Sequence, residues 1–254
     1  MARGPIVPEY LNLIALDRVD STNEEIKRRA ANGAADGTLV WAGEQLAGRG
    51  RRNRDWVSPT GNLYCSLLLR PKCPTHEAMQ LSFVTALAVA DAIEAALPDG
   101  TTVTCKWPND VLADGQKVAG ILLESSAGGE GTLEWLVIGV GVNVATAPAN
   151  TDGPYPAGSL SEIGAVSATP RDLLETYCGR FFHWRDVWSA MGFSVIRDAW
   201  LDRAHGLREP IQVRLDNDTL EGVFLTMDES GALVLGQGGS SRLIMAGDVF
   251  PAGA

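Results

Sequence analysis

The 254-residue sequence has few cysteines, and their spacing is not that of a structural site. The four cysteines lie far apart without a CxxC pair, which fits neither a disulfide framework nor a zinc site, so reduced thiols in the cytoplasm are expected. No apolar run approaches the roughly 18 residues of a membrane span, and no secretion signal is visible at the N-terminus. The three histidines, His76, His183 and His205, are scattered, and we expect ordinary structural or surface roles for them.

Basic side chains are also scarce relative to acidic ones. The chain has 21 Lys and Arg against 31 Asp and Glu, a formal charge of −10, which argues against general binding of nucleic acid. Two nucleotide-binding signatures are missing. There is no GxxxxGK[ST] sequence, and Gly139-x-Gly141 lacks the third glycine and the following helix of a dinucleotide fingerprint, so both glycines are interpreted as structural. Any use of ATP would need another kind of site.

Apolar patterning and turn residues predict mixed helices and strands over the first 205 residues. Strands are expected at residues 11–16, 38–43, 63–70, 101–106, 111–113, 117–125 and 133–144, and helices at 24–32, 74–97, 170–188 and 193–204. Residues 146–159 are rich in Ala, Pro, Gly and Asn and predict a long surface loop. Four short strands, at 211–215, 220–227, 233–235 and 241–246, then predict a small β-barrel.

The densest chemical signal is the arginine loop, Gly48 to Trp56, which carries four arginines within six residues. A guanidinium keeps its charge and offers a planar fork of donors to phosphate or carboxylate, while the two glycines permit unusual backbone shapes. The loop therefore suits a polyanionic ligand. The alternative is a solvated basic loop without a ligand, and the arginine run alone leaves both interpretations open.

A second loop carries Lys106-Trp107-Pro108-Asn109-Asp110, and Lys117 follows seven residues later. A hairpin of residues 111–113 with 118–122 would bring Lys117 and the Asn109-Asp110 pair to one site. In that site Trp107 would offer a flat apolar surface, and Asp110 an anion for a metal ion or a hydroxyl group. A purely structural salt bridge between Asp110 and Lys117 is the alternative.

Together with Ser21-Thr22-Asn23 and the segment 139–143, these loops resemble the ordered motifs of biotin protein ligases. The similarity runs through nearly the whole chain, and the arginine loop followed by Lys-Trp-Pro-Asn-Asp is specific in that order. Asn53 is the one departure in the arginine loop, because the family usually has glycine there. Asparagine tolerates positive φ better than most residues, so the loop geometry can survive the change.

The resemblance implies an α+β fold, with a central mixed β-sheet flanked by helices over residues 1–205 and a small SH3-like β-barrel over residues 206–254. The implied reaction has two steps. The biotin carboxylate attacks the α-phosphate of ATP to give biotinyl-5′-adenylate and pyrophosphate, with Mg²⁺ present. A lysine of a biotin carboxyl carrier domain of a biotin-dependent carboxylase then takes the biotinyl group as an amide. Such chemistry needs charge neutralisation and alignment more than a protein nucleophile.

Site residues are implied by the same resemblance. The implied ligand-binding residues are Ser21, Thr22, Asn23, Gln45, Gly48, Arg49, Gly50, Arg51, Arg52, Trp56, Lys106, Asn109, Lys117, Gly120 and Asn143, and the implied catalytic residues are Lys117, Arg51, Arg49 and Asp110. The first four would contact biotin, the arginines would clamp carboxylate and phosphates, and Trp56 would pack against adenine. Lys117 would contact the biotin carboxyl and the α-phosphate, with Gly120 leaving space for the ligand. Asn109 and Asp110 would bind nucleotide or Mg²⁺ and orient the acceptor lysine, and Asn143 would lie beside adenine or ribose.

Three other functions remain open at this stage. A lipoate-protein ligase shares the implied fold and acyl-adenylate chemistry, although the arginine loop with Trp56 favours biotin. Some biotin ligases are also repressors with an N-terminal helix-turn-helix domain, but only 20 residues precede Ser21, so no operator binding is expected. A non-catalytic biotin-binding module is the third possibility. The sequence does not choose between a monomer and a homodimer.

Overall fold

A mixed β-sheet forms the centre of the protein, in a computed structural model that describes residues 5–149 and 155–252. The sheet consists of β1 (Asn12–Leu16), β2 (Thr38–Ala42), β3 (Leu63–Leu69), β4 (Val103–Lys106), β5 (Asp110–Ala113), β6 (Gln116–Ala127) and β7 (Leu133–Val142). Across the described residues the strand order is β1-β2-β3-β7-β6-β5-β4. β1 and β2 are parallel, whereas the other neighbouring pairs are antiparallel, which confirms the predicted mixed sheet.

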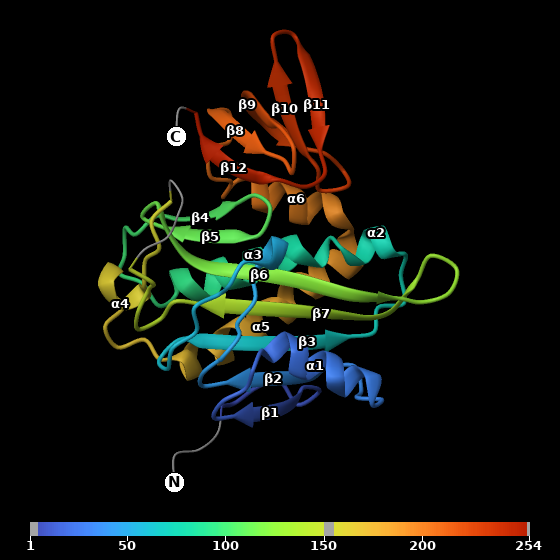
Figure 1. The fold of residues 1–254 in the computed structure, drawn as a ribbon, viewed down its shortest axis with the longest axis vertical. Coiled ribbons are helices and arrows are strands. Elements are labelled where there is room, and N and C mark those ends of the chain that lie inside the picture. The colour runs from blue at the N-terminus through green and yellow to red at the C-terminus, as the bar shows by residue number, and fades with distance from the viewer. Residues whose placement is uncertain (1–4, 150–154, 253–254) are drawn as a thin grey trace.

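Helices cover the two faces of this sheet unequally (Figure 1). They are α1 (Thr22–Ala31), α2 (Thr75–Ala78), α3 (Leu81–Glu94), α4 (Leu160–Ile163), α5 (Pro170–Met191) and α6 (Phe193–Leu201). Side chains alternate along a strand, so β3 sends Cys65 and Leu67 into the main core with α3 and α5. Leu68 points to the other face, where it packs with Ile26 of α1. No helix within the described ranges is long and apolar enough to cross a membrane.

The C-terminal strands form a second, antiparallel sheet at one end of the molecule (Figure 1). They are β8 (Pro210–Arg214), β9 (Thr219–Met227), β10 (Leu233–Gln237), β11 (Ser240–Ile244) and β12 (Asp248–Pro251), in the order β11-β10-β9-β8-β12. This sheet shares one hydrophobic core with the rest of the protein. At the junction Gly231 packs so closely on Phe83 that an added Cβ would lie 2.4 Å from its ring. The predicted α+β fold with a small C-terminal β unit is confirmed.

Three local features differ from the prediction. The helix expected over residues 74–97 is divided into α2 and α3 by a turn at Met79 and Gln80. The short helix α4 and the strand β12 were not predicted. α4 lies beside the predicted loop 146–159 and begins at a capping box in which Ser159 and Glu162 bond reciprocally. Residues 146–149 and 155–159 have no helix or strand, and the remaining part of that loop, 150–154, lies outside the described residues.

Candidate active site

A cavity of about 420 Å³ lies on the face of the central sheet beside α1, a size typical of small-molecule sites. The predicted residues that line it are Ser21, Thr22, Asn23, Gln45, Arg49, Gly50, Arg51, Trp56, Lys106, Asn109, Asp110, Lys117, Gly120 and Asn143. They come from segments up to 122 positions apart, which the sheet brings together. Two other predicted residues, Gly48 and Arg52, are not part of the lining that the described residues form.

One end of the cavity is a neutral hydrogen-bonding network at the start of α1. The backbone N–H and the hydroxyl of Thr22 both donate to Oε1 of Gln45, at 2.8 and 3.0 Å. Gln45 donates through Nε2 to Ser58 Oγ at 2.9 Å, and Ser66 of β3 donates to Thr22 Oγ1 at 2.8 Å. Each bond fixes the direction of the next, so the polar groups at this end are set before any ligand arrives.

The need for glycine at position 48 comes from close packing near this network, not from a ligand contact. An added Cβ would lie 2.3 Å from the carbonyl oxygen of Trp56 and 2.4 Å from Ser58 Oγ. The N–H of Trp56 also donates to the Gly48 carbonyl at 2.9 Å. Gly48 therefore closes the base of the arginine loop by a contact that a larger residue would prevent.

The floor of the cavity is made by glycines of two adjacent strands. Gly120 of β6 and Gly141 of β7 are register partners, and the indole of Trp56 lies over both. An added Cβ would lie 2.9 Å from Trp56 Cζ3 at position 120 and 2.6 Å from Trp56 Nε1 at position 141. Gly139 is covered similarly by Asn23, whose Oδ1 would lie 2.2 Å from an added Cβ. The structural interpretation of Gly139 and Gly141 was incomplete, because both also line the cavity.

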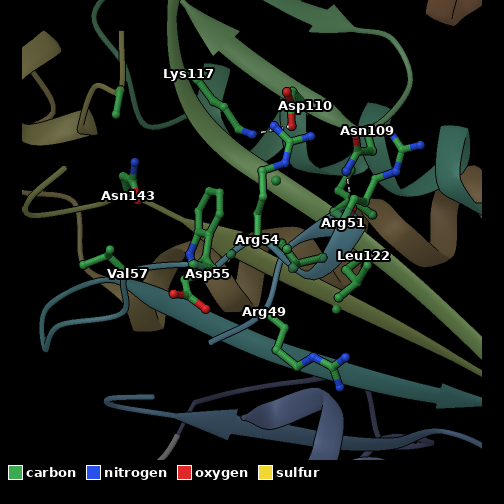
Figure 2. Close-up of a pocket in the computed structure, with 18 of the residues that line it drawn as sticks. Arg49, Arg51, Arg54, Asp55, Val57, Asn109, Asp110, Lys117, Leu122 and Asn143 are labelled. Carbon is green, nitrogen blue, oxygen red and sulfur yellow. Dashed lines mark hydrogen bonds and ion pairs between the residues drawn. The ribbon is translucent and has the colours of Figure 1, made fainter. Parts of the chain in front are cut away.

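A cluster of three charges, two of them buried, forms the opposite end. The hairpin of β5 and β6 brings Lys117 Nζ to 2.7 Å from Asp110 Oδ1 (Figure 2). Lys106 Nζ lies 3.0 Å from Oδ2 of the same carboxylate. Burial opposes ionisation of Asp110, but the two ammonium groups outweigh it and lower the pKa of Asp110 to about 2. Asp110 is thus an anion at neutral pH, and with its two lysines the cluster carries one net positive charge.

The arginine loop spans the space between these two ends. Arg51 donates from Nη1 to Asn109 Oδ1 at 3.2 Å, and Asn109 donates through Nδ2 to the Ile121 carbonyl at 2.6 Å. Figure 2 shows Arg49 pointing the other way, toward α1, where it forms an ion pair with Glu24. Burial lowers the pKa of Arg51, although nearby carboxylates oppose this effect. Asn53 adopts φ 56°, as its tolerance of positive φ allows.

Asn143 lies at the end of β7, 2% exposed, and presents an acceptor that the protein does not use. Its Nδ2 donates to the Gly158 carbonyl at 3.1 Å, but its Oδ1 has no hydrogen-bond partner among the described residues. The Trp56 Nε1 is buried and unpartnered in the same part of the structure. Unsatisfied buried polar atoms are costly, so both atoms at this cavity are candidates for ligand contacts.

Trp107 does not offer a surface to the cavity, contrary to the expectation from sequence. Its side chain is 1% exposed, and its Nε1 donates to the Gly231 carbonyl of the C-terminal unit at 3.0 Å. The indole is therefore an anchor between the Lys-Trp-Pro-Asn-Asp loop and the C-terminal sheet. Trp107 supports the loop that carries Lys106 and Asp110 from behind.

Comparison with known proteins shows which family this chain belongs to. Residues 15–143 match the biotin/lipoate A/B protein ligase family, and residues 208–250 match the biotin protein ligase C-terminal domain. This chain belongs to the biotin/lipoate A/B protein ligase family. It is 43% identical to a biotin--[acetyl-CoA-carboxylase] ligase of Paracoccus denitrificans, over 92% of this chain and 98% of that protein. The predicted family is confirmed.

The chain is also similar to a longer bacterial protein and to a solved ligase structure. It is 34% identical to a bifunctional ligase/repressor BirA of Bacillus subtilis, over 94% of this chain and 73% of that protein. The fold matches a biotin protein ligase of Aquifex aeolicus in complex with biotin and ATP, with a TM-score of 0.79 and 29% identity. That match covers 94% of this chain and 97% of the Aquifex chain.

Sequence reasoning missed several residues around the cavity of this ligase family member. They are Arg54, Asp55, Val57, Ile121, Leu122, Val140, Pro148, Tyr155, Ala157, Asp248 and Phe250. Arg54 lay in a motif already singled out and could have been found there. Asp248 and Phe250 could not, because they belong to the unpredicted strand β12 and reach the site through the tertiary fold alone.

The predicted magnesium role of Asp110 does not fit the geometry of this ligase family member. Both carboxylate oxygens face ammonium groups, and a divalent cation at this position would lie between two positive charges. No group of three His, Cys, Asp or Glu side chains suited to a metal ion occurs in residues 5–149 and 155–252.

Proposed function

We propose that this ligase family member is an ATP-dependent biotin protein ligase that forms biotinyl-5′-adenylate and transfers the biotinyl group to a lysine of a carrier domain. The observation that carries this proposal is one cavity with a neutral hydrogen-bonding end, a flat apolar floor and a cationic end. Biotin, adenine and the reacting carboxylate and phosphates require these three environments in turn. The names of the relatives from Paracoccus and Aquifex support the same function.

The cationic end accounts for the first step. One oxygen of the biotin carboxylate bonds to the α-phosphorus, and the bond from this phosphorus to the bridging oxygen breaks, releasing pyrophosphate. Both reactants are anions, so positive groups must hold them together and neutralise charge in the transition state. Lys117 and Arg51 would take this role, and their position in the cavity lining supports the assignment. Arg49 would join them after leaving Glu24.

The neutral end suits the uncharged ureido ring of biotin. Such a ring requires a few fixed donors and acceptors in a pocket from which water is largely excluded. Ser21, Thr22 and Asn23 are at most 4% exposed, and Gln45 already holds Thr22 in place. The dithiolane ring of lipoate and the hydrocarbon tail of octanoate offer no comparable donors and acceptors, which is the reason to prefer biotin.

Trp56 and Asn143 are assigned to the nucleotide. The indole would stack with adenine, a contact typical of aromatic side chains and bases, and the free Oδ1 of Asn143 would accept a hydrogen bond from adenine or ribose. In the second step the ε-amine of the carrier lysine attacks the adenylate carbonyl carbon, forming the amide while AMP leaves. Asp110 would orient that amine through its charge.

Several further features of this proposal come from the sequence. The carrier would be a domain of a biotin-dependent carboxylase, which the name of the Paracoccus relative supports. A cytoplasmic location, the absence of operator binding, and a boundary between the two structural units near residue 205 also stay predictions, as does the choice between monomer and homodimer. Mg²⁺ would enter with the ATP phosphates instead of through Asp110.

The test is biotin-dependent exchange of labelled pyrophosphate into ATP, with lipoate and octanoate as parallel substrates and with Mg²⁺ omitted in one arm. Exchange with biotin alone supports the proposal. Exchange with lipoate would assign the protein to lipoate ligation, and no exchange in a folded sample would favour a non-catalytic binding module. Lys117→Gln should abolish most of the exchange, whereas Lys72→Gln, at an exposed position, is the matched control.

A further inference from the structure

The C-terminal sheet holds the arginine loop through one carboxylate. Asp248, the first residue of β12, lies 2.6 Å from Arg54 Nη2 and 3.3 Å from Arg52 Nη1. Arg51 adds a weaker contact, from Nη1 to the Gly247 carbonyl at 3.4 Å. Three of the four guanidiniums in the loop thus contact two consecutive residues of the C-terminal unit, almost 200 positions away in the chain.

The loop needs such an anchor, for two physical reasons. Its arginines carry four positive charges within six residues, and these charges repel one another when no ligand is bound. Its tip also contains two consecutive non-glycine residues in the left-handed region, Arg52 at φ 53° and Asn53 at φ 56°. For a residue such as arginine this conformation is unfavourable and persists only when surrounding contacts hold it.

Asp248 differs from Asp216, the other acidic residue of the C-terminal unit that pairs with the arginine loop. Its side chain is 16% exposed and bonds two guanidiniums, whereas Asp216 is 81% exposed and reaches only Arg52, at 3.2 Å. Exposed ion pairs contribute little, while partly buried, charge-assisted hydrogen bonds contribute more. Asp248 also lines the cavity, so its carboxylate lies where the loop meets the ligand site.

We propose that Asp248 is a positioning residue, which fastens the arginine loop over the cavity and so retains the acyl-adenylate until the acceptor amine arrives. The retention of an adenylate rests on the proposed function, whereas the fastening of the loop does not. By engaging Arg52 and Arg54, Asp248 leaves Arg51 beside Asn109 as the guanidinium available to the reacting phosphate. The C-terminal unit thereby takes part in the ligation without touching the reacting atoms.

The fastening can be measured in the full-length protein without ligands. Trypsin cleavage within residues 49–54, followed by mass spectrometry, reports opening of the loop, because each variant keeps every arginine. Asp248→Asn should be cut about tenfold faster than the wild type, the factor expected when a charge-assisted hydrogen bond is lost. Asp248→Glu should restore most of the protection, and Asp216→Asn should be cut at the wild-type rate. Equal cleavage of Asp248→Asn and wild type would overturn the proposal.

Retention of the intermediate is tested by its fate in single turnovers with biotin and ATP. Asp248→Asn should release or hydrolyse about tenfold more adenylate per biotinyl group transferred and should raise the KM for ATP, with a smaller fall in kcat. A merely structural role would instead lower the amount of folded protein and leave this partition unchanged, which would overturn the retention part. If the wild type forms no adenylate, the proposed function fails, and the cleavage experiment still decides whether Asp248 fastens the loop.

Discussion

Replacing Asp110 by asparagine should destabilise the protein strongly, because it removes the only counter-charge seen for a buried ammonium group in the described residues. The side chain of Lys106 is 8% exposed and lies 3.0 Å from Asp110, whereas Lys117 is 33% exposed and can turn toward water. Breaking a buried ion pair from one side costs about 3–5 kcal/mol, and most of that cost would come from Lys106. Removing both charges with Lys106→Met and Asp110→Leu should cost less than Asp110→Asn alone.

The assay is urea unfolding at neutral pH, with Asp186→Asn as the control. Asp186 pairs with Arg185 at 2.9 Å but is 70% exposed, so its loss should change the free energy of unfolding by less than about 0.5 kcal/mol. A loss below about 1 kcal/mol for Asp110→Asn would refute the reasoning.

The pH dependence of unfolding follows from the same carboxylate. The pKa of Asp110 is about 2 in the folded protein, below its value of about 3.9 in an unfolded chain. The ionised carboxylate therefore stabilises the fold above about pH 4, and this contribution is lost as the pH falls toward 2. The wild type should lose this stability between those pH values, while Asp110→Asn should lack that part of the decline.

Three further changes test individual roles in the cavity. Lys117→Ala should slow pyrophosphate exchange by about 10²–10³-fold with a much smaller loss in biotin affinity by titration, and equal losses would contradict its role in the transition state. Gly141→Ala should displace the Trp56 indole, which lies 2.6 Å from the added Cβ, and raise the KM for ATP, whereas Gly129→Ala, with open space around it, should not. Asn143→Ala should raise the KM for ATP about tenfold while leaving that for biotin unchanged. An unchanged KM for ATP would remove Asn143 from the nucleotide site.

Local sequence patterns predicted most of the fold, whereas the resemblance to biotin protein ligases implied about half of the residues that line the cavity. The hairpin that joins Asp110 to Lys117 could be predicted because two short apolar runs flank a turn, and this register alone brings the two charges together. Residues 139–142 were correctly assigned to a strand, which ends at Val142 instead of residue 144. Gly139 and Gly141 were harder to interpret from sequence. Their role depends on which side chain packs against each of them, Asn23 on Gly139 and Trp56 on Gly141, and only the structure shows this.

The features that were missed depend on contacts between distant segments. β12 is four residues long and ends at a proline, so it has too few alternating residues to be recognised. Asp248 meets Arg52 across 196 positions, and no local pattern encodes that meeting. α4 could have been predicted, because Ser159 and Glu162 have the spacing of a capping box. Trp107 was misplaced because a large aromatic side chain in a polar motif indicates burial and ligand contact equally well.

The bond from Trp107 to Gly231 means that the C-terminal sheet cannot be exchanged as an independent module. The Gly231 carbonyl accepts a hydrogen bond from Trp107, and Lys106 of the cavity directly precedes Trp107 in the chain. A shift of the C-terminal sheet would therefore move Lys106 too. Insertions in the turn that carries Gly231 would therefore displace Lys106. Variation in this protein should therefore accumulate in the exposed edge strand β11, while the turn that carries Gly231 changes only together with the catalytic loops.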